Sequence, residues 1–247
     1  MGKELMTGGV SMNQSSNGDR FLAAFNRVEH ALKEIVGAKN YMPFYRLVDL
    51  AKKKTVVVKK YQDDLKTYAD LRNAIVHNRT AVDYIIAEPH IGVVERLEEI
   101  DRHLNSPQNV LSVCSKGVQT FQITASLNEV LQVIHQHKYT QFPIYNGNEF
   151  QGLLTTVSIT RWIAAQITAQ GHLPTTLPTL QELSLQDEKG KNYQFVAKDT
   201  SVLIAEEVFK AHIGKGRRIE ALLVTEHGHS HEKLLGIITP MDIVEKV

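Results

Sequence analysis

The sequence predicts an all-α helical bundle followed by an α/β domain that is made of two β-α-β-β-α repeats. Hydrophobic residues recur with helical spacing from about residue 19 to residue 104, and near Val110 the pattern changes to short strands and helices. One strand-turn-strand-helix pattern then occurs twice. A chain of 247 residues is long enough for two domains of ordinary size.

The domain boundaries follow from changes in composition and period. Residues 1–17 are rich in Gly, Ser and Asn without periodicity, so we expect a disordered lead or a segment left from cloning. Residues 18–106 are expected to form the helical domain, including a connector helix, and residues 107–247 the repeat domain. Repeat one is expected over about 110–168 and repeat two over about 190–247.

The helical domain is expected to contain four helices, over residues 20–36, 44–51, 58–75 and 93–104. Asp19 is the expected N-cap of the first helix, and Gly37 its expected end. Pro43 stands where the second helix begins. Four helices with short links indicate a bundle.

The two repeats share the same order of elements. The first copy places an amphipathic helix at 127–134 before the strands 142–145 and 152–156, which a turn at Asn146-Gly147 joins. The second copy places a helix at 202–209 before the strands 221–224 and 236–238. A threonine opens the last helix of each copy. Because duplicated folds usually bind at the interface between their halves, we expect a site there.

These repeats resemble the CBS domain, and together they resemble a CBS pair, or Bateman module, over Val110 to Val247. The run Gly236-Ile-Ile-Thr-Pro-Met-Asp242 matches the family's Gly-h-h-Ser/Thr-x-x-Asp nucleotide signature. A carboxylate accepts hydrogen bonds from ribose hydroxyls, which is the chemistry this signature needs. The resemblance implies that the ligand-binding residues are Thr239, Asp242, Ile237, Thr124, Tyr139 and Thr140, with Arg217 and Arg218 reaching a phosphate.

Two other interpretations of these residues stay open. Thr239 and Asp242, with Pro240 between them, also fit a capping box, which stabilises a helix start without any ligand. The basic stretch with Arg217 and Arg218 also fits a solvated loop tip.

The first repeat departs from the signature, because Ser158 stands where the carboxylate belongs. We therefore expect one functional pocket and at most a weaker second site with Thr155, Ser158 and Thr200.

The sequence His227-Gly-His-Ser-His231 brings three imidazoles into one short loop. Alternate residues of an extended segment share one side, which favours metal binding. However, the loop lacks a second shell of oriented partners, so we expect no metal site.

The run Leu71 to Asn78 contains Arg72 and His77 and resembles the Arg-x4-6-His motif of HEPN domains. This resemblance implies a metal-independent ribonuclease in which His77 moves the ribose 2′-OH proton and Arg72 stabilises the charged phosphorane. The alternative is an ordinary helix end in a bundle that binds or dimerises without catalysis.

Composition limits the function classes. A net charge of +1 argues against a broad basic surface for nucleic acid. Cys114 is the single cysteine, which excludes an intrachain disulfide and indicates a cytoplasmic protein. No apolar run is long enough to span a membrane.

The sequence thus predicts a regulatory, ligand-sensing protein, expected to be a homodimer. Its CBS pair binds AMP, ADP, ATP or another adenosine derivative and modulates the helical domain or a partner, and no cofactor is required. The alternative is a HEPN-type ribonuclease, toxin or antiphage-like, that the CBS pair gates, and only this alternative implies RNA as a partner.

Overall fold

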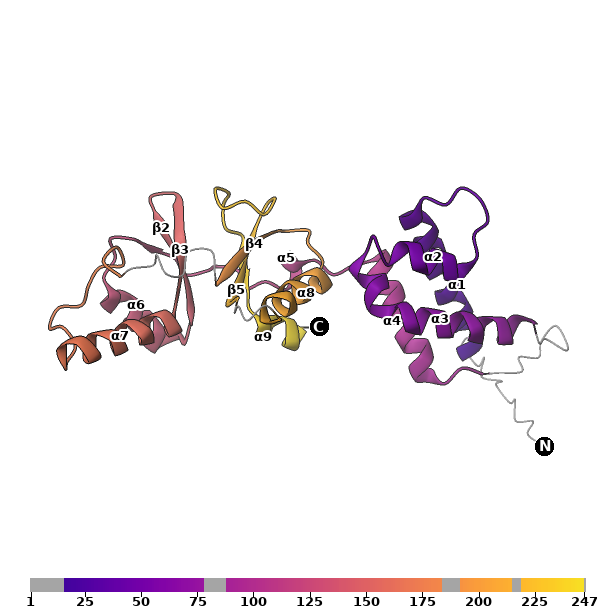
Figure 1. The fold of residues 1–247 in the computed structure, drawn as a ribbon, viewed down its shortest axis with the longest axis horizontal. Helices are drawn as coiled ribbons and strands as arrows, with labels where there is room; N and C mark the ends of the chain where they lie inside the picture. Colours follow the sequence, from indigo (N-terminus) through magenta and orange to yellow (C-terminus); the bar gives the residue numbers. More distant parts are fainter. Residues whose placement is uncertain (1–15, 78–87, 184–191, 215–218, 247) are drawn as a thin grey trace, which may run out of the picture. The chain divides into compact units, whose positions relative to one another are not determined.

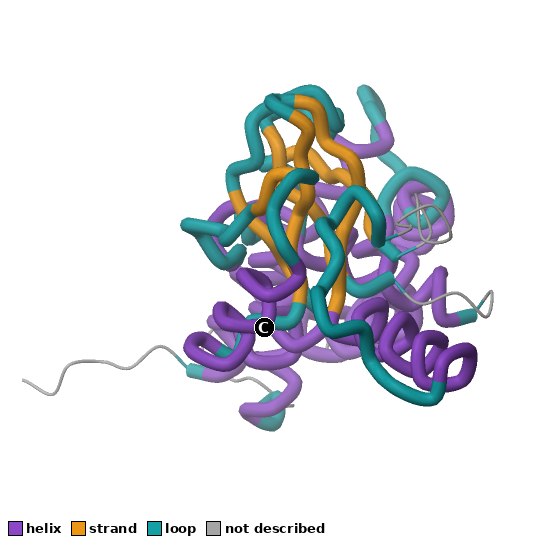
Figure 2. The backbone as a smooth tube through the Cα atoms, turned by 90° about the vertical axis from the view of Figure 1, so that its left-hand side faces the viewer, coloured by secondary structure: helices purple, strands orange, loops and turns teal. Residues whose placement is uncertain are grey.

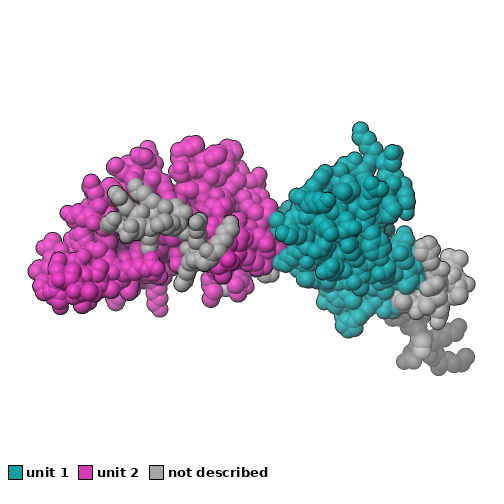
Figure 3. All heavy atoms as spheres, in the orientation of Figure 1, with its two compact units in different colours: residues 1–107 teal, residues 108–247 magenta. Residues whose placement is uncertain are grey.

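The computed structural model describes residues 16–77, 88–183, 192–214 and 219–246. The chain divides into two compact units, of which unit 1 ends at Pro107 and unit 2 begins at Gln108 (Figure 3). The described part of unit 1 contains helices and no strands, and all described strands belong to unit 2 (Figure 1).

Unit 1 contains the helices α1 (Asn17–Val36), α2 (Phe44–Ala51), α3 (Val56–His77) and α4 (Ile91–Asn105). Helix α1 packs against α2 and α4, and α2 packs against α3. Fully buried side chains from all of these helices form the core, among them Phe21, Leu32, Leu47, Leu65, Leu97 and Ile100. The predicted helical character of this region is confirmed.

The beginning of α1 differs from the prediction. Ser16, and not Asp19, is the N-cap, because the Ser16 hydroxyl oxygen accepts a hydrogen bond from the Asp19 backbone N–H at 3.0 Å. The Ser16 hydroxyl also donates to the Asp19 carboxylate at 2.9 Å. The other end agrees with the sequence, since Gly37 ends the helix in the left-handed conformation at φ 74°.

Polar contacts on α4 add to the core of unit 1. The Arg96 guanidinium lies 3.2 Å from the Asp64 carboxylate of α3 and 2.9 Å from the Glu99 carboxylate of its own helix. The same guanidinium lies 4.6 Å from the centre of the Tyr61 ring. The contacts with Asp64 and Tyr61 link α4 to α3.

Unit 2 begins with the short helix α5 (Val110–Val113) and contains two repeats. Repeat one comprises β1 (Phe121–Gln122), α6 (Leu127–His137), β2 (Gln141–Asn146), β3 (Glu149–Thr155) and α7 (Thr156–Gln170). Repeat two comprises β4 (Tyr193–Ala197), α8 (Val202–Ile213), β5 (Ala221–Thr225), β6 (Gly236–Ile238) and α9 (Pro240–Lys246).

The two repeats have the same sheet topology. The strand orders are β1-β2-β3 and β4-β5-β6. In each sheet the first pair of strands is parallel and the second pair is antiparallel. The predicted order of elements in both copies is therefore confirmed, and the unit has the architecture of a duplicated fold.

Three apolar clusters hold unit 2 together. Repeat one buries Phe121, Leu127 and Phe142 in one cluster. A second cluster joins the two sheets, because Leu153 of β3 packs with Leu223 of β5 and Ile237 of β6. The orange strands in Figure 2 all belong to these two sheets. The contact between the two sheets is therefore part of the apolar core of unit 2.

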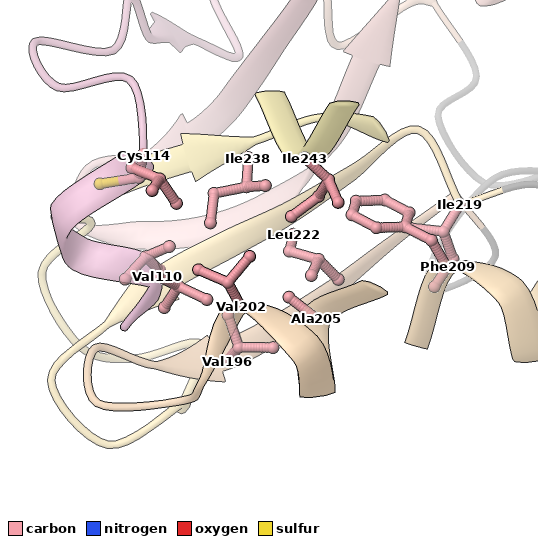
Figure 4. Packing of buried hydrophobic residues seen from close by; sticks show 12 residues of the cluster. Val110, Cys114, Val196, Val202, Ala205, Phe209, Ile219, Leu222, Ile238 and Ile243 are labelled. Carbon is pink, nitrogen blue, oxygen red and sulfur yellow. The ribbon is translucent and has the colours of Figure 1, made fainter. Parts of the chain in front are cut away.

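The third cluster shows that the chain enters unit 2 through the core of repeat two. Val110 and Cys114 precede repeat one, yet they pack with Val202, Leu222 and Ile238 (Figure 4). The next residue, Ser115, forms an isolated antiparallel bridge with Ile237. This arrangement places the segment that follows α5 directly beside the end of β6.

Candidate functional site

A pocket of about 520 Å³ lies in unit 2 and is lined by three chain segments. The first segment follows α5, the second connects α6 to β2, and the third spans the end of β6 and the start of α9. The lining residues are Ser115, Lys116, Gly117, Val118, Gln119, Lys138, Tyr139, Thr140, Gln141, Ile237, Thr239 and Asp242.

The third segment brings a carboxylate to the pocket. The Asp242 carboxylate oxygen Oδ2 accepts hydrogen bonds from the Thr239 backbone N–H at 2.8 Å and from the Thr239 hydroxyl at 2.9 Å. The Asp242 N–H lies 3.4 Å from the Thr239 hydroxyl oxygen. This is the reciprocal geometry of a capping box, and it fixes the carboxylate at the pocket wall.

The first segment is fixed against β6 by backbone contacts. The Ser115 N–H donates to the Ile237 carbonyl at 2.9 Å, and the Ile237 N–H donates to the Ser115 carbonyl at 3.1 Å. The approach needs Gly236, because a Cβ atom there would lie 2.3 Å from the Cys114 sulfur. The Ser115 hydroxyl reaches the other Asp242 oxygen, Oδ1, at 3.5 Å.

The second segment contributes an aromatic ring and a cation. Tyr139 is 49% exposed, and its ring stacks on that of His137 with 5.4 Å between the ring centres. Lys138 ends α6 in the left-handed conformation at φ 58°. The Thr140 hydroxyl donates to the Gln141 side-chain oxygen at 2.7 Å, so this part of the wall is polar.

The pocket brings together five of the residues that the sequence assigned to it, which are Ile237, Thr239, Asp242, Tyr139 and Thr140. Thr124 does not line this pocket; it is exposed and precedes Ser126, the N-cap of α6. Arg217 and Arg218 lie outside the described residues.

Sequence reasoning missed the whole first segment, 115–119, and also Lys138 and Gln141. The segment pairs with Ile237 through one isolated bridge, which leaves no periodic pattern in the sequence. Gly117, at φ 69°, is the one local sign of a turn there.

The residues of the expected weaker site have a different setting. Thr155 is the N-cap of α7 and is 2% exposed, and its hydroxyl oxygen lies 2.9 Å from that of Ser158. Thr200 is half-buried, and its carbonyl accepts from the Val110 N–H at 2.8 Å. None of these three residues lines the pocket at Asp242 or the pocket at the hairpin ends that is described next.

The second of these pockets has a volume of about 500 Å³ and lies at the hairpin ends of the repeats. Thr120, Gln122 and Tyr145 of repeat one face it together with the segment from His231 to Leu234 of repeat two. Burial raises the pKa of Tyr145.

The histidine loop is organised by Glu232. The Glu232 carboxylate accepts from the backbone N–H of His227 at 2.8 Å and from that of His229 at 3.2 Å. The His227 N–H, together with weaker contacts from the His227 ring and the His229 N–H, lowers the pKa of Glu232 to about 2. Across the described residues, no group of three or more His, Cys, Asp or Glu side chains is arranged to hold a metal ion.

In unit 1, Arg72 and His77 both lie on α3. The Arg72 guanidinium lies 3.5 Å from the side-chain oxygen of its neighbour Asn73. The side chain of His77 lies outside the described residues.

Comparison with known proteins identifies one part of the chain. The family model of the CBS domain matches residues 110–165, which comprise α5 and most of repeat one. Repeat two has the same topology, and the two repeats form a pair. No curated protein matches the chain.

Solved structures with sequence identities of 11–19% resemble this chain over 56–57% of its length. The CBS domain pair of protein MJ0100 in complex with 5′-methylthioadenosine and S-adenosyl-L-methionine is 19% identical, with 57% of this chain and 95% of that chain covered at a TM-score of 0.39. A hemolysin-like protein containing a CBS domain from Oenococcus oeni PSU is 16% identical, with coverages of 56% and 89% and a TM-score of 0.41. A CBS-domain-containing protein of unknown function from Kribbella flavida is 11% identical, with coverages of 56% and 97% and the same TM-score of 0.41.

No described helix has both the length and the apolar character that crossing a membrane requires.

Proposed function

We propose that this chain is a regulatory protein whose CBS pair binds an adenosine-type nucleotide in the pocket at Asp242. The observation that carries the proposal is the meeting of both repeats at one pocket. Thr239 and Asp242 come from repeat two, while Tyr139 and Thr140 come from repeat one. A volume of about 520 Å³ falls within the range of about 300–1,000 Å³ that small-molecule sites occupy.

The chemistry of the pocket walls suits a nucleoside. An ionised carboxylate accepts hydrogen bonds from two neighbouring hydroxyls, as a ribose presents them. A ribose hydroxyl would compete at Asp242 with the Ser115 hydroxyl, whose bond of 3.5 Å is at the limit of a hydrogen bond. The half-exposed ring of Tyr139 offers a flat surface for a base.

The capping box and the ligand site are compatible roles for the same residues. The capping bonds of Thr239 and Asp242 hold the carboxylate in one position, and a preorganised acceptor binds with less loss of side-chain entropy. If Thr239 and Asp242 only cap α9, the pocket binds no nucleotide. A binding measurement therefore distinguishes the two roles.

We propose that ligand binding acts on the helical unit or on a partner protein. The resemblance of the helical unit to HEPN domains stays a proposal, supported by the position of Arg72 and His77 on one helix.

We also propose a homodimer, because Ile167 of α7 and Met241 and Val244 of α9 are exposed apolar residues, and isologous dimers are the commonest assembly. Light scattering at tens of micromolar should give twice the chain mass, and a monomer would contradict the dimer.

Thermal unfolding of the full chain with added nucleotides tests the proposed function. A ligand present at a hundredfold its dissociation constant should stabilise unit 2 by about 2.7 kcal/mol. AMP, ADP, ATP and S-adenosylmethionine are the test ligands, and GMP is the matched control because it differs from AMP in its base alone. Stabilisation by none of the adenosine compounds would contradict the proposal.

A further inference from the structure

The backbone at Lys138 has a conformation that lysine rarely adopts. Lys138 is the one residue other than glycine with a positive φ among those described. Two other helices of this chain, α1 and α7, also end in the left-handed conformation, and they use Gly37 and Gly171 there. Glycine is the usual residue at this position because a Cβ atom crowds the backbone. The chain therefore keeps a lysine where the fold favours glycine.

The position of Lys138 indicates a role for its side chain at the pocket. Lys138 lines the Asp242 pocket from the second segment, and Lys116 lines it from the first. Both side chains are exposed, and neither ammonium group has a carboxylate within ion-pair distance among the described parts of the chain. Residues other than glycine that adopt the left-handed conformation cluster at ligand sites and other functional sites.

The charges of the pocket walls define the ligand that fits. Asp242 is the one acidic side chain among the lining residues, against two lysines. Its carboxylate already accepts two hydrogen bonds from Thr239, which offsets its charge locally. An anionic group that enters near Lys116 and Lys138 gains from both ammonium groups, whereas a cation there is repelled.

We infer that Lys116 and Lys138 form an anion subsite that selects a phosphorylated adenosine nucleotide over neutral adenosine and over the sulfonium cation S-adenosylmethionine. This inference rests on the proposed function, since it divides the pocket into a nucleoside part at Asp242 and a phosphate part at the lysines. Lys138 and Lys116 act as specificity-determining residues.

Isothermal titration of the full chain with AMP, adenosine, S-adenosylmethionine and inorganic phosphate tests the subsite. The wild type should bind AMP about tenfold or more tightly than adenosine, because a charge-assisted contact contributes about that factor. Inorganic phosphate alone should bind more weakly than AMP, because it lacks the contacts at Asp242.

Three variants distinguish an effect of the lysine charge on AMP binding from an effect on the stability of the fold. Lys138→Gly and Lys116→Gln should each weaken AMP binding about tenfold and leave adenosine binding within about twofold. Lys138→Gly should melt at or above the wild-type temperature, because glycine suits φ 58°. Lys233→Gln is the matched control, since it removes the same charge at the other pocket and should change neither affinity.

The outcomes distinguish the inference from the proposed function. Equal affinities of the wild type for AMP and adenosine would overturn the subsite and leave the nucleoside site standing. Equal losses of AMP and adenosine binding in Lys138→Gly would also overturn it, because the residue would then shape the wall and not hold an anion. Binding of none of the adenosine compounds would overturn the proposed function and the subsite with it.

Discussion

The entrances to α7 and α9 occupy the same place in the two repeats and use nearly the same capping bonds. In repeat one the Ser158 N–H lies 3.1 Å from the Thr155 hydroxyl oxygen, and in repeat two the Asp242 N–H lies 3.4 Å from that of Thr239. The residue three positions after the threonine differs between the repeats. In repeat one it is Ser158, whose hydroxyl oxygen lies 2.9 Å from that of Thr155. In repeat two it is Asp242, whose carboxylate lines the pocket.

This difference separates what the fold needs from what a ligand needs. Repeat one forms its last helix without a carboxylate, so the charge of Asp242 is not required for a helix at this position. Thr155 is buried at 2% exposure, whereas Thr239 is half-buried and lines the pocket. The two entrances thus share a structural role, and the entrance of repeat two also contributes residues to the wall of the pocket.

The largest expected effect comes from the close packing beneath the pocket. Gly236→Ala should destabilise unit 2 by about 1–3 kcal/mol, the range for overpacking, because the added Cβ would meet the Cys114 sulfur at 2.3 Å and the Ser115 carbonyl oxygen at 3.0 Å. Chemical denaturation of the full chain measures this. The double variant Cys114→Ala/Gly236→Ala should recover part of the loss, and a neutral Gly236→Ala would contradict the packing beside Ser115.

The next effect tests whether the two entrances share their structural role. Thr155→Ala and Thr239→Ala should each lower the free energy of unfolding by about 1 kcal/mol, since each removes an N-cap side chain. Nucleotide binding should fall in Thr239→Ala and stay unchanged in Thr155→Ala. Loss of binding in both variants, measured by titration with AMP, would mean that the repeats contribute alike.

The smallest effect concerns the opposite ends of the repeats. In repeat one the Gln122 amide holds the turn, accepting from the Gly147 N–H at 2.9 Å, while in repeat two the Glu232 carboxylate holds the loop. The His227 N–H is the main cause of the low pKa of Glu232, about 2 instead of 4.5.

A carboxylate with a depressed folded pKa stabilises the protein above its unfolded pKa. The contribution of Glu232 should therefore be present above pH 4.5 and lost as the pH falls toward about 2. Glu232→Gln should flatten this part of the acid unfolding curve, whereas Gln122→Ala should shift the curve without changing its slope. An unchanged slope in Glu232→Gln would show that the carboxylate is not held as described.

The sequence predicted the elements that depend on local pattern. Helical period located α1 to α4, and the spacing of Thr239 and Asp242 located the start of α9. Ser16 was missed as a cap because it lies in a Gly/Ser/Asn-rich segment, while Asp19, three residues later, fits the same cap signal.

Two of the three segments of the pocket were predicted, the second through Tyr139 and Thr140 and the third through Ile237, Thr239 and Asp242. Ile237, Thr239 and Asp242 belong to one motif, so they can be read locally. Ser115 reaches the pocket because Val110 and Cys114 are buried in the core of repeat two, and such a long-range contact has no local signal. Lys138 was missed for another reason, since a lysine in the sequence gives no sign of a positive φ.

The central claim is that Asp242 makes one dominant nucleotide site per chain. Isothermal titration of AMP into the full-length wild type, Asp242→Asn and Ser158→Ala tests it most directly, with unfolding midpoints measured on the same samples. We predict one site per chain, a loss of about 1.5–3 kcal/mol in binding free energy for Asp242→Asn, and no more than about 0.5–1.5 kcal/mol for Ser158→Ala. Two equivalent sites per chain, or equal affinities in wild type and Asp242→Asn, would contradict the claim.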